Sequence, residues 1–162
     1  MHLSGETDIA AGRQRVWDTV TDARQVAACV PGRPKVEVVD ERHMKVTAAV
    51  GNGFLRTTVV VDIRLTDLQA PVRATAAAGT VVMGGPVQAD GSLELTELAA
   101  GRTHAVWAAD VTLGGFLASF ASMVEAPVRS GVDQTLACLT AKIEAAEAAA
   151  TAQSPGSGES PA

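Results

Sequence analysis

The residues best suited to chemistry in this 162-residue chain are three histidines, two cysteines and a scatter of carboxylates. A histidine beside a thiol or hydroxyl would activate a nucleophile, and a carboxylate in an apolar setting would serve as a general acid or base. His2, His43 and His104 stand far apart, and neither Cys29 nor Cys138 has a histidine near it in sequence. We therefore interpret the histidines as surface residues and expect no catalytic site.

The cysteines also lack the close pairing of a zinc or redox motif, and no other metal-ligand spacing or phosphate-binding glycine loop is present. We expect Cys29 and Cys138 to be buried or half-buried free thiols in a reducing compartment. The pairs Gly84-Gly85 and Gly114-Gly115 are interpreted as turns. No metal and no covalent cofactor are expected.

Two carboxylates fall on strand-like segments. Asp62 and Asp110 each alternate with the apolar positions of their segment, which predicts that both face solvent. Either one would become an acid–base candidate only by facing inward, where burial raises the pKa of a carboxyl group.

Composition narrows the partners. The net charge is −5 and no basic run is interleaved with aromatic residues, which argues against nucleic acid and weakens strong adsorption to anionic lipid. The first residues lack the basic and apolar regions of a secretory signal, and no apolar run of about 18 residues is present. We expect a cytoplasmic protein, peripheral at most to the inner face of the cytoplasmic membrane.

The elements that would position these groups follow from periodicity. Residues 2–9 alternate as a strand, residues 10–22 change to helical spacing, and Asp22 is placed to cap a second short helix that Pro31-Gly32 ends. About six alternating segments separated by short turns then run from residue 36 to residue 113, which predicts an antiparallel meander.

After residue 115 the period changes again, and apolar residues recur every three or four positions as on one long amphipathic helix. That stripe is Leu117, Phe120, Val124, Val128, Val132, Leu136, Leu139 and Ile143. Pro127 should kink the helix near Met123. We assign residues 1–145 to one α+β domain and residues 146–162 to a flexible tail rich in Ala, Ser, Gly and Pro.

The interior has few rings, since aromatic residues are 3% of the chain and tyrosine is absent. Alanine-biased codon usage would explain this, and so would an interior cavity that a ligand fills. On the second reading, an alanine-rich sheet face opposes a bulky, adaptable helix stripe. The candidate ligand-binding residues are Val46, Ala48, Phe54, Val61, Ile63, Ala76, Ala78, Trp107 and Ala109 on the sheet, with Phe116, Phe120, Met123 and Val124 on the helix.

A set of short motifs, in order along the chain, carries a family resemblance. They are Leu3, Gly5 and Ile9; Val16-Trp17; Cys29-Val30-Pro31-Gly32; Val50-Gly51; Ala78-Gly79; and Thr103, Trp107 and Asp110 before Gly114-Gly115. Over roughly residues 1–145 the chain resembles the carbon monoxide dehydrogenase accessory-subunit family CoxG, of the START-like (SRPBCC) superfamily. The resemblance implies a helix-grip fold, with a curved sheet of about seven strands around a long C-terminal helix and two short helices after the first strand.

The same resemblance implies an accessory protein of a molybdenum hydroxylase such as carbon monoxide dehydrogenase, in transient contact with the membrane. Because such an enzyme passes electrons to an insoluble quinone, we expect a non-catalytic carrier whose ligand is a respiratory quinone such as menaquinone. Two alternatives stay open at this point. One is a recruitment or assembly factor that acts through its surface, and the other is a START-like cyclase or hydrolase.

Overall fold

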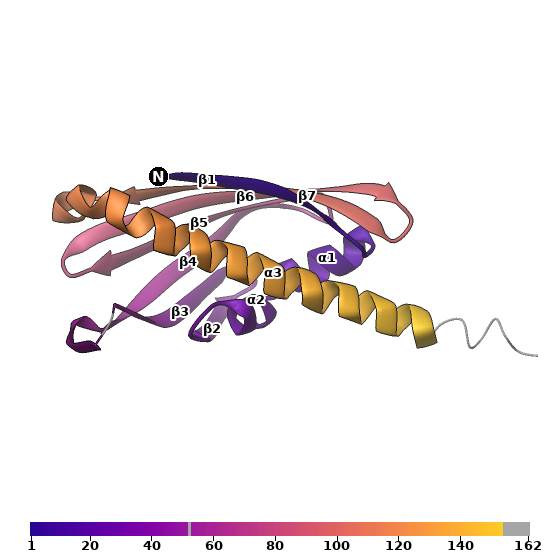
Figure 1. The fold of residues 1–162 in the computed structure, drawn as a ribbon, viewed down its shortest axis with the longest axis horizontal. Coiled ribbons are helices and arrows are strands. Elements are labelled where there is room, and N and C mark those ends of the chain that lie inside the picture. Colours follow the sequence, from indigo (N-terminus) through magenta and orange to yellow (C-terminus); the bar gives the residue numbers. More distant parts are fainter. Residues whose placement is uncertain (52, 154–162) are drawn as a thin grey trace, which may run out of the picture.

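The computed structural model describes residues 1–51 and 53–153, which form one antiparallel sheet beside three α-helices (Figure 1). The seven strands lie in the order β1-β7-β6-β5-β4-β3-β2, so β1 pairs with β7 at one edge and β2 forms the other. The strands are β1 (His2–Ile9), β2 (Lys35–Asp40), β3 (His43–Val50), β4 (Thr57–Gln69), β5 (Arg73–Val82), β6 (Gly85–Ala99) and β7 (Arg102–Leu113). The helices are α1 (Arg13–Val20), α2 (Ala23–Cys29) and α3 (Ala121–Gln153). The predicted α+β helix-grip architecture is confirmed.

The two short helices follow β1 as the change of period predicts. Asp22 caps α2, because its carboxylate accepts hydrogen bonds from the backbone N–H groups of Arg24 and Gln25, at 3.0 and 3.5 Å. The side-chain amide of Gln25 also donates to Asp22, and this bond is the largest of the contacts that lower the pKa of the Asp22 carboxyl. The predicted capping role of Asp22 is confirmed.

The long C-terminal helix starts later and ends later than the sequence pattern predicts. Residues Gly115–Phe120 form a separate 3-10 helix, η2, so Leu117 and Phe120 precede α3 rather than belonging to it. The reason is the turn before it, where Gly115 has a φ of 60° and the Gly114 N–H donates to the Pro86 carbonyl at 2.8 Å. Pro127 lies inside α3.

At its other end α3 runs to Gln153, beyond the domain boundary predicted at residue 145. The alanine-rich composition of this stretch favours continued helix, since alanine has the highest helix propensity. The remainder of the predicted tail, residues 154–162, lies outside the described residues.

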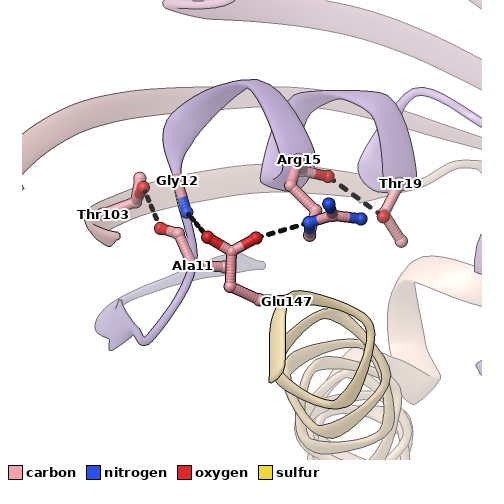
Figure 2. A network of polar contacts seen from close by, with 6 residues as sticks. All are labelled: Ala11, Gly12, Arg15, Thr19, Thr103 and Glu147. Carbon is pink, nitrogen blue, oxygen red and sulfur yellow. Dashed lines mark hydrogen bonds and ion pairs between the residues drawn. The ribbon is translucent and has the colours of Figure 1, made fainter. Parts of the chain in front are cut away.

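The buried core is concentrated where α1, the second half of α3 and the adjoining ends of β1, β6 and β7 meet. Its buried members are Ile9, Ala11, Val16, Trp17, Leu95, Ala105 and Ile143. Polar contacts join the same elements (Figure 2). The Glu147 carboxylate accepts from the Gly12 N–H at 3.3 Å and from the Arg15 guanidinium, and the buried Thr103 hydroxyl donates to the Ala11 carbonyl at 2.7 Å. We call this region the closed end.

The prediction of two free thiols is wrong, because Cys29 and Cys138 form a disulfide. Cys29 ends α2 and Cys138 lies in the middle of α3, and their Cα atoms are 5.5 Å apart. The two helices pack together although 109 residues separate the cysteines, and sequence spacing gives no sign of that proximity. The bond also removes the argument for a reducing compartment that rested on free thiols.

Candidate ligand-binding cavity

A cavity of about 520 Å³ lies between α2 and the concave side of the sheet. Its roof comes from the second helix and its flanks, through Val20, Thr21, Ala23, Val26, Ala27, Val30 and Pro34. Its floor comes from five neighbouring strands, through Met44, Val46, Ala48, Val61, Ile63, Leu65, Ala74, Thr75, Ala76, Gly91, Ser92, Leu93, Trp107 and Ala108. Small residues at Ala48, Ala74 and Ala76 leave the space open, because no long side chain from the central strands fills it.

The polar residues in this lining do not aim free groups into the cavity. The Thr21 hydroxyl donates to the Trp17 carbonyl at 2.7 Å, as part of its own helix end. Thr75 is bonded through its hydroxyl to Thr66, and strand alternation turns it away from the face that carries Ala74 and Ala76. The interior is therefore almost wholly apolar, a surface that suits hydrocarbon.

Trp107 forms one wall of the cavity, and its position depends on a glycine. Gly5 on β1 pairs with Trp107 on β7, and a Cβ added at Gly5 would lie 2.8 Å from the Trp107 Nε1. The edge of the indole therefore rests on the bare backbone of Gly5. Among the side chains that line the cavity, Trp107 carries the one N–H donor.

A family comparison decides the relationship of the chain. Residues 5–144 match the model of the carbon monoxide dehydrogenase family described as CoxG. The chain belongs to the CoxG family. No curated protein matches it.

Solved structures show that the CoxG-family fold is shared widely. A conserved protein from Geobacillus kaustophilus matches with a TM-score of 0.77 at 19% identity, over 88% of this chain and 95% of that one. The ZhuI aromatase/cyclase from Streptomyces sp. R1128 matches with a TM-score of 0.65 at 18% identity, over 89% and 93%. A protein from Thermus thermophilus matches with a TM-score of 0.65 at 14% identity, over 90% and 99%. At these identities the likeness concerns the helix-grip fold alone.

The structure brings about half of the predicted ligand-binding residues of this CoxG-family chain to the cavity. Those that line it are Val46, Ala48, Val61, Ile63, Ala76 and Trp107. Ala78 and Ala109 share the concave face with Ala76 and Trp107, because each lies two residues further along its strand, but they do not line the cavity. Ligand contact at any of these residues stays a prediction.

The remaining predicted residues lie elsewhere. Phe54 was expected to face inward, but it belongs to the 3-10 helix η1 (Gly53–Leu55) between β3 and β4 and is 98% exposed. Phe116 and Phe120 in η2 are exposed, as is Met123 in the first turn of α3, and Val124 is half-buried and off the cavity. The first half of α3 does not cover the central strands, because α2 occupies that place.

The cavity residues that the sequence interpretation missed come mainly from α2. The alternation of the sheet strands pointed to their inward faces, and the apolar positions Val26 and Val30 indicated a helix face that needed a partner. Nothing in a single sequence showed that this short helix, rather than the long one, lies over β3, β4 and β5. The disulfide partner of Cys29 would have been the signal, because it places α3 beside α2.

The predicted candidates for chemistry lie away from the cavity of this CoxG-family chain. Three histidine–aspartate pairs join neighbouring strands, namely His2 with Asp110, His43 with Asp62, and His104 with Asp8. The hydrogen bond from His43 is the main cause of a lowered pKa at Asp62, and the hydrogen bond to Asp8 is the main cause of a raised pKa at His104. Residues 1–51 and 53–153 contain no cluster of three metal-ligating side chains. Within the same residues, every helix is too short or too polar to span a bilayer.

Proposed function

We propose that this CoxG-family chain is a non-catalytic carrier that holds an apolar ligand between α2 and the sheet. The ligand is a respiratory quinone such as menaquinone, which the carrier moves between the cytoplasmic membrane and a molybdenum-containing carbon monoxide dehydrogenase. The observation that carries the proposal is the apolar cavity of about 520 Å³. The family description supports the dehydrogenase as partner.

The size and chemistry of the cavity suit a ring with part of an isoprenoid tail. Small-molecule sites usually enclose about 300–1,000 Å³ and combine an apolar wall with a few polar groups. If about 400 Å² of ligand surface left water, the gross gain would be about 10 kcal/mol. A bilayer offers the same ligand a similar gain, so transfer between membrane and cavity is close to thermoneutral. That balance favours a carrier over a permanent store.

The lining also supports binding without catalysis. General acid–base and nucleophilic chemistry need a titratable or nucleophilic side chain at the ligand. The side chains named above as lining the cavity include no His, Asp, Glu, Lys, Arg, Cys or Tyr. The aromatase/cyclase from Streptomyces shares only the fold, and an assembly factor that acts through its surface would need no interior space.

Extraction of the purified protein tests the carrier proposal. Protein from a quinone-producing host is extracted with organic solvent and the extract is analysed by mass spectrometry. We expect a quinone in near-stoichiometric amount. In Ala76→Phe a ring occupies the cavity, so the quinone content should fall about tenfold or more, since the apolar contacts of one ring are worth at least that factor.

Ala77→Phe is the matched control, because the neighbouring residue on the same strand points to the opposite face. It should leave the quinone content unchanged. Recovery of phospholipid alone, or equal quinone content in the two variants, would overturn the proposed function.

A further inference from the structure

Apolar side chains are exposed on three segments at one end of the sheet. Phe54 in η1 is 98% exposed, and Met83 in the turn between β5 and β6 is 70% exposed. Phe116 and Phe120 in η2 are 51% and 44% exposed, and Met123 at the start of α3 is 70% exposed. These segments lie at the left of Figure 1, opposite the closed end. We call them together the open end.

The three segments form one surface rather than scattered tips. The β5–β6 turn packs directly on η2, since the Gly114 N–H donates to the Pro86 carbonyl and a Cβ at Gly85 would overlap Leu117. The strand after η1 runs beside the end of β5, where the Thr80 hydroxyl donates to the Val60 carbonyl at 2.7 Å. Residues 81–87 and 113–124 contain no charged side chain.

A basic groove of about 320 Å³ lies beside the open end. Its charged lining residues are Arg33, Lys35 and Arg56, all exposed and all cationic. Pro34 and Ala48 line both this groove and the apolar cavity, so the two spaces adjoin. The net charge of −5 predicted weak attraction to anionic lipid, but the local charge at this place has the opposite sign.

We propose that the open end docks on a membrane of anionic phospholipid. Phe54 and Met83 enter the boundary between headgroups and acyl chains, while Arg33, Lys35 and Arg56 contact the phosphates. The combination of exposed apolar side chains with adjacent cations is typical of interfacial membrane binding. The proposal extends the carrier function by naming its membrane face, and it rests on that function only for what passes between bilayer and cavity.

The charge pattern favours lipid over a second copy of the chain. A two-fold contact brings the same patch of both subunits together, so the cations of one copy would be held near the cations of the other. Like charges so placed oppose association, whereas an anionic bilayer neutralises them. The apolar segments also project from separate turns, a shape that enters a deformable bilayer readily.

Vesicle flotation tests the apolar part of the surface. Wild-type protein is mixed with vesicles of phosphatidylcholine alone or with phosphatidylglycerol added, and we expect binding mainly to the second. Phe54→Ser should weaken binding about tenfold or more, because one fully buried ring contributes at least that factor. Leu98→Ser is the matched control, since Leu98 is 53% exposed near the end of β6, at the closed end. It should bind like wild type.

A second pair of variants tests the charge. Arg56→Glu should weaken binding to the anionic vesicles about twentyfold, at about fivefold for each unit of charge. Lys142→Glu makes the same change in net charge at an exposed position in the second half of α3 and should have little effect. Added salt should weaken the binding of wild type more than that of Arg56→Glu, because screening acts on the charges that remain.

Insertion is measured with a tryptophan probe and brominated lipid chains, which quench only at the bilayer. Fluorescence of Phe54→Trp should be quenched and that of Leu98→Trp should not, after the signal of Trp17 and Trp107 in wild type is subtracted. Equal binding by Phe54→Ser and Leu98→Ser would overturn the docking proposal. A concentration-dependent dimer that Phe54→Ser abolishes, without vesicle binding, would overturn it in favour of self-association.

These outcomes are separable from failure of the carrier function. Phe54→Ser should lose vesicle binding but still take up a quinone supplied in detergent, because Phe54 does not line the cavity. Ala76→Phe should show the reverse, with vesicle binding retained and quinone uptake lost. Loss of quinone uptake in both wild type and Phe54→Ser would contradict the carrier proposal alone.

Discussion

The two ends of this molecule use apolar residues in opposite ways. At the closed end Leu95 and Ile143 are each 1% exposed, whereas at the open end Phe54 is 98% and Met83 70% exposed. Both ends are built from the same sheet and the same long helix. The contrast shows that one well-packed end can supply the stability of a small domain, so that the other end is free to stay open for a ligand or a membrane.

Helix α3 carries this contrast along its own length. Its second half is fixed by the buried side chains of Leu139 and Ile143, and the carboxylates of Glu144 and Glu147 accept hydrogen bonds from the backbone before α1. Its first turns carry exposed Met123 and no such contacts among the described residues. The helix is therefore anchored at the closed end and projects toward the open one.

The disulfide gives the largest expected effect, because it joins α2, the roof of the cavity, to α3. Replacing both cysteines by alanine should lower the free energy of unfolding by about 4 kcal/mol, as expected for a cross-link that closes a loop of about 110 residues. Denaturant titration measures this, and wild type under a reductant should unfold at the same midpoint as the double variant. A loss below about 1 kcal/mol would mean that packing alone holds α2 in place.

A pair of Ala→Phe substitutions compares the two interiors directly. Ala105 is 5% exposed within the closed-end core, so Ala105→Phe should cost about 3 kcal/mol through overpacking. Ala76 lines the cavity, so Ala76→Phe should change stability by less than about 0.5 kcal/mol, since the ring enters existing space. Thermal and denaturant unfolding measure both. Equal losses would show that the region under α2 is packed as tightly as the closed end.

The fold followed from the sequence because its signals are local. The alternation of each strand, the change of period at residue 10 and the cap at Asp22 each depend on a few neighbouring residues, and all appear in the structure. The boundaries of α3 did not follow, because the turn at Gly114-Gly115 produced a 3-10 helix that keeps nearly the same apolar spacing.

The site could be predicted only as far as strand alternation reaches. Val61, Ile63 and Ala76 were assigned correctly to the concave face, since their orientation is fixed by period two. Which helix covers that face is a tertiary choice between α2 and α3, and apolar spacing is similar in both. The disulfide was missed for the same reason, because contact between residues 109 apart leaves no local pattern.

The smallest expected effect concerns the histidine–aspartate pairs, which lie at both ends and should not share the contrast. The hydrogen bond to Asp8 raises the pKa of His104, so the protonated pair stabilises the fold below pH 6.5, and the contribution is lost as the pH rises through the folded-state pKa. His104→Gln should therefore lower Tm by about 1–2 °C near pH 5.5 and leave it unchanged near pH 9.

Asp62 provides the control with the opposite window. Its pKa lies below 3.8 because His43 donates a hydrogen bond to it, so its contribution is present at neutral pH and is lost as the pH falls through the lowered folded-state pKa. Asp62→Asn should lower Tm near pH 7 but not in strong acid. Neither substitution should alter quinone content, because neither residue lines the cavity. A pH-dependent change of ligand content in His104→Gln would show that the outer face of the sheet is coupled to the interior, and the division into two independent ends would then have to be abandoned.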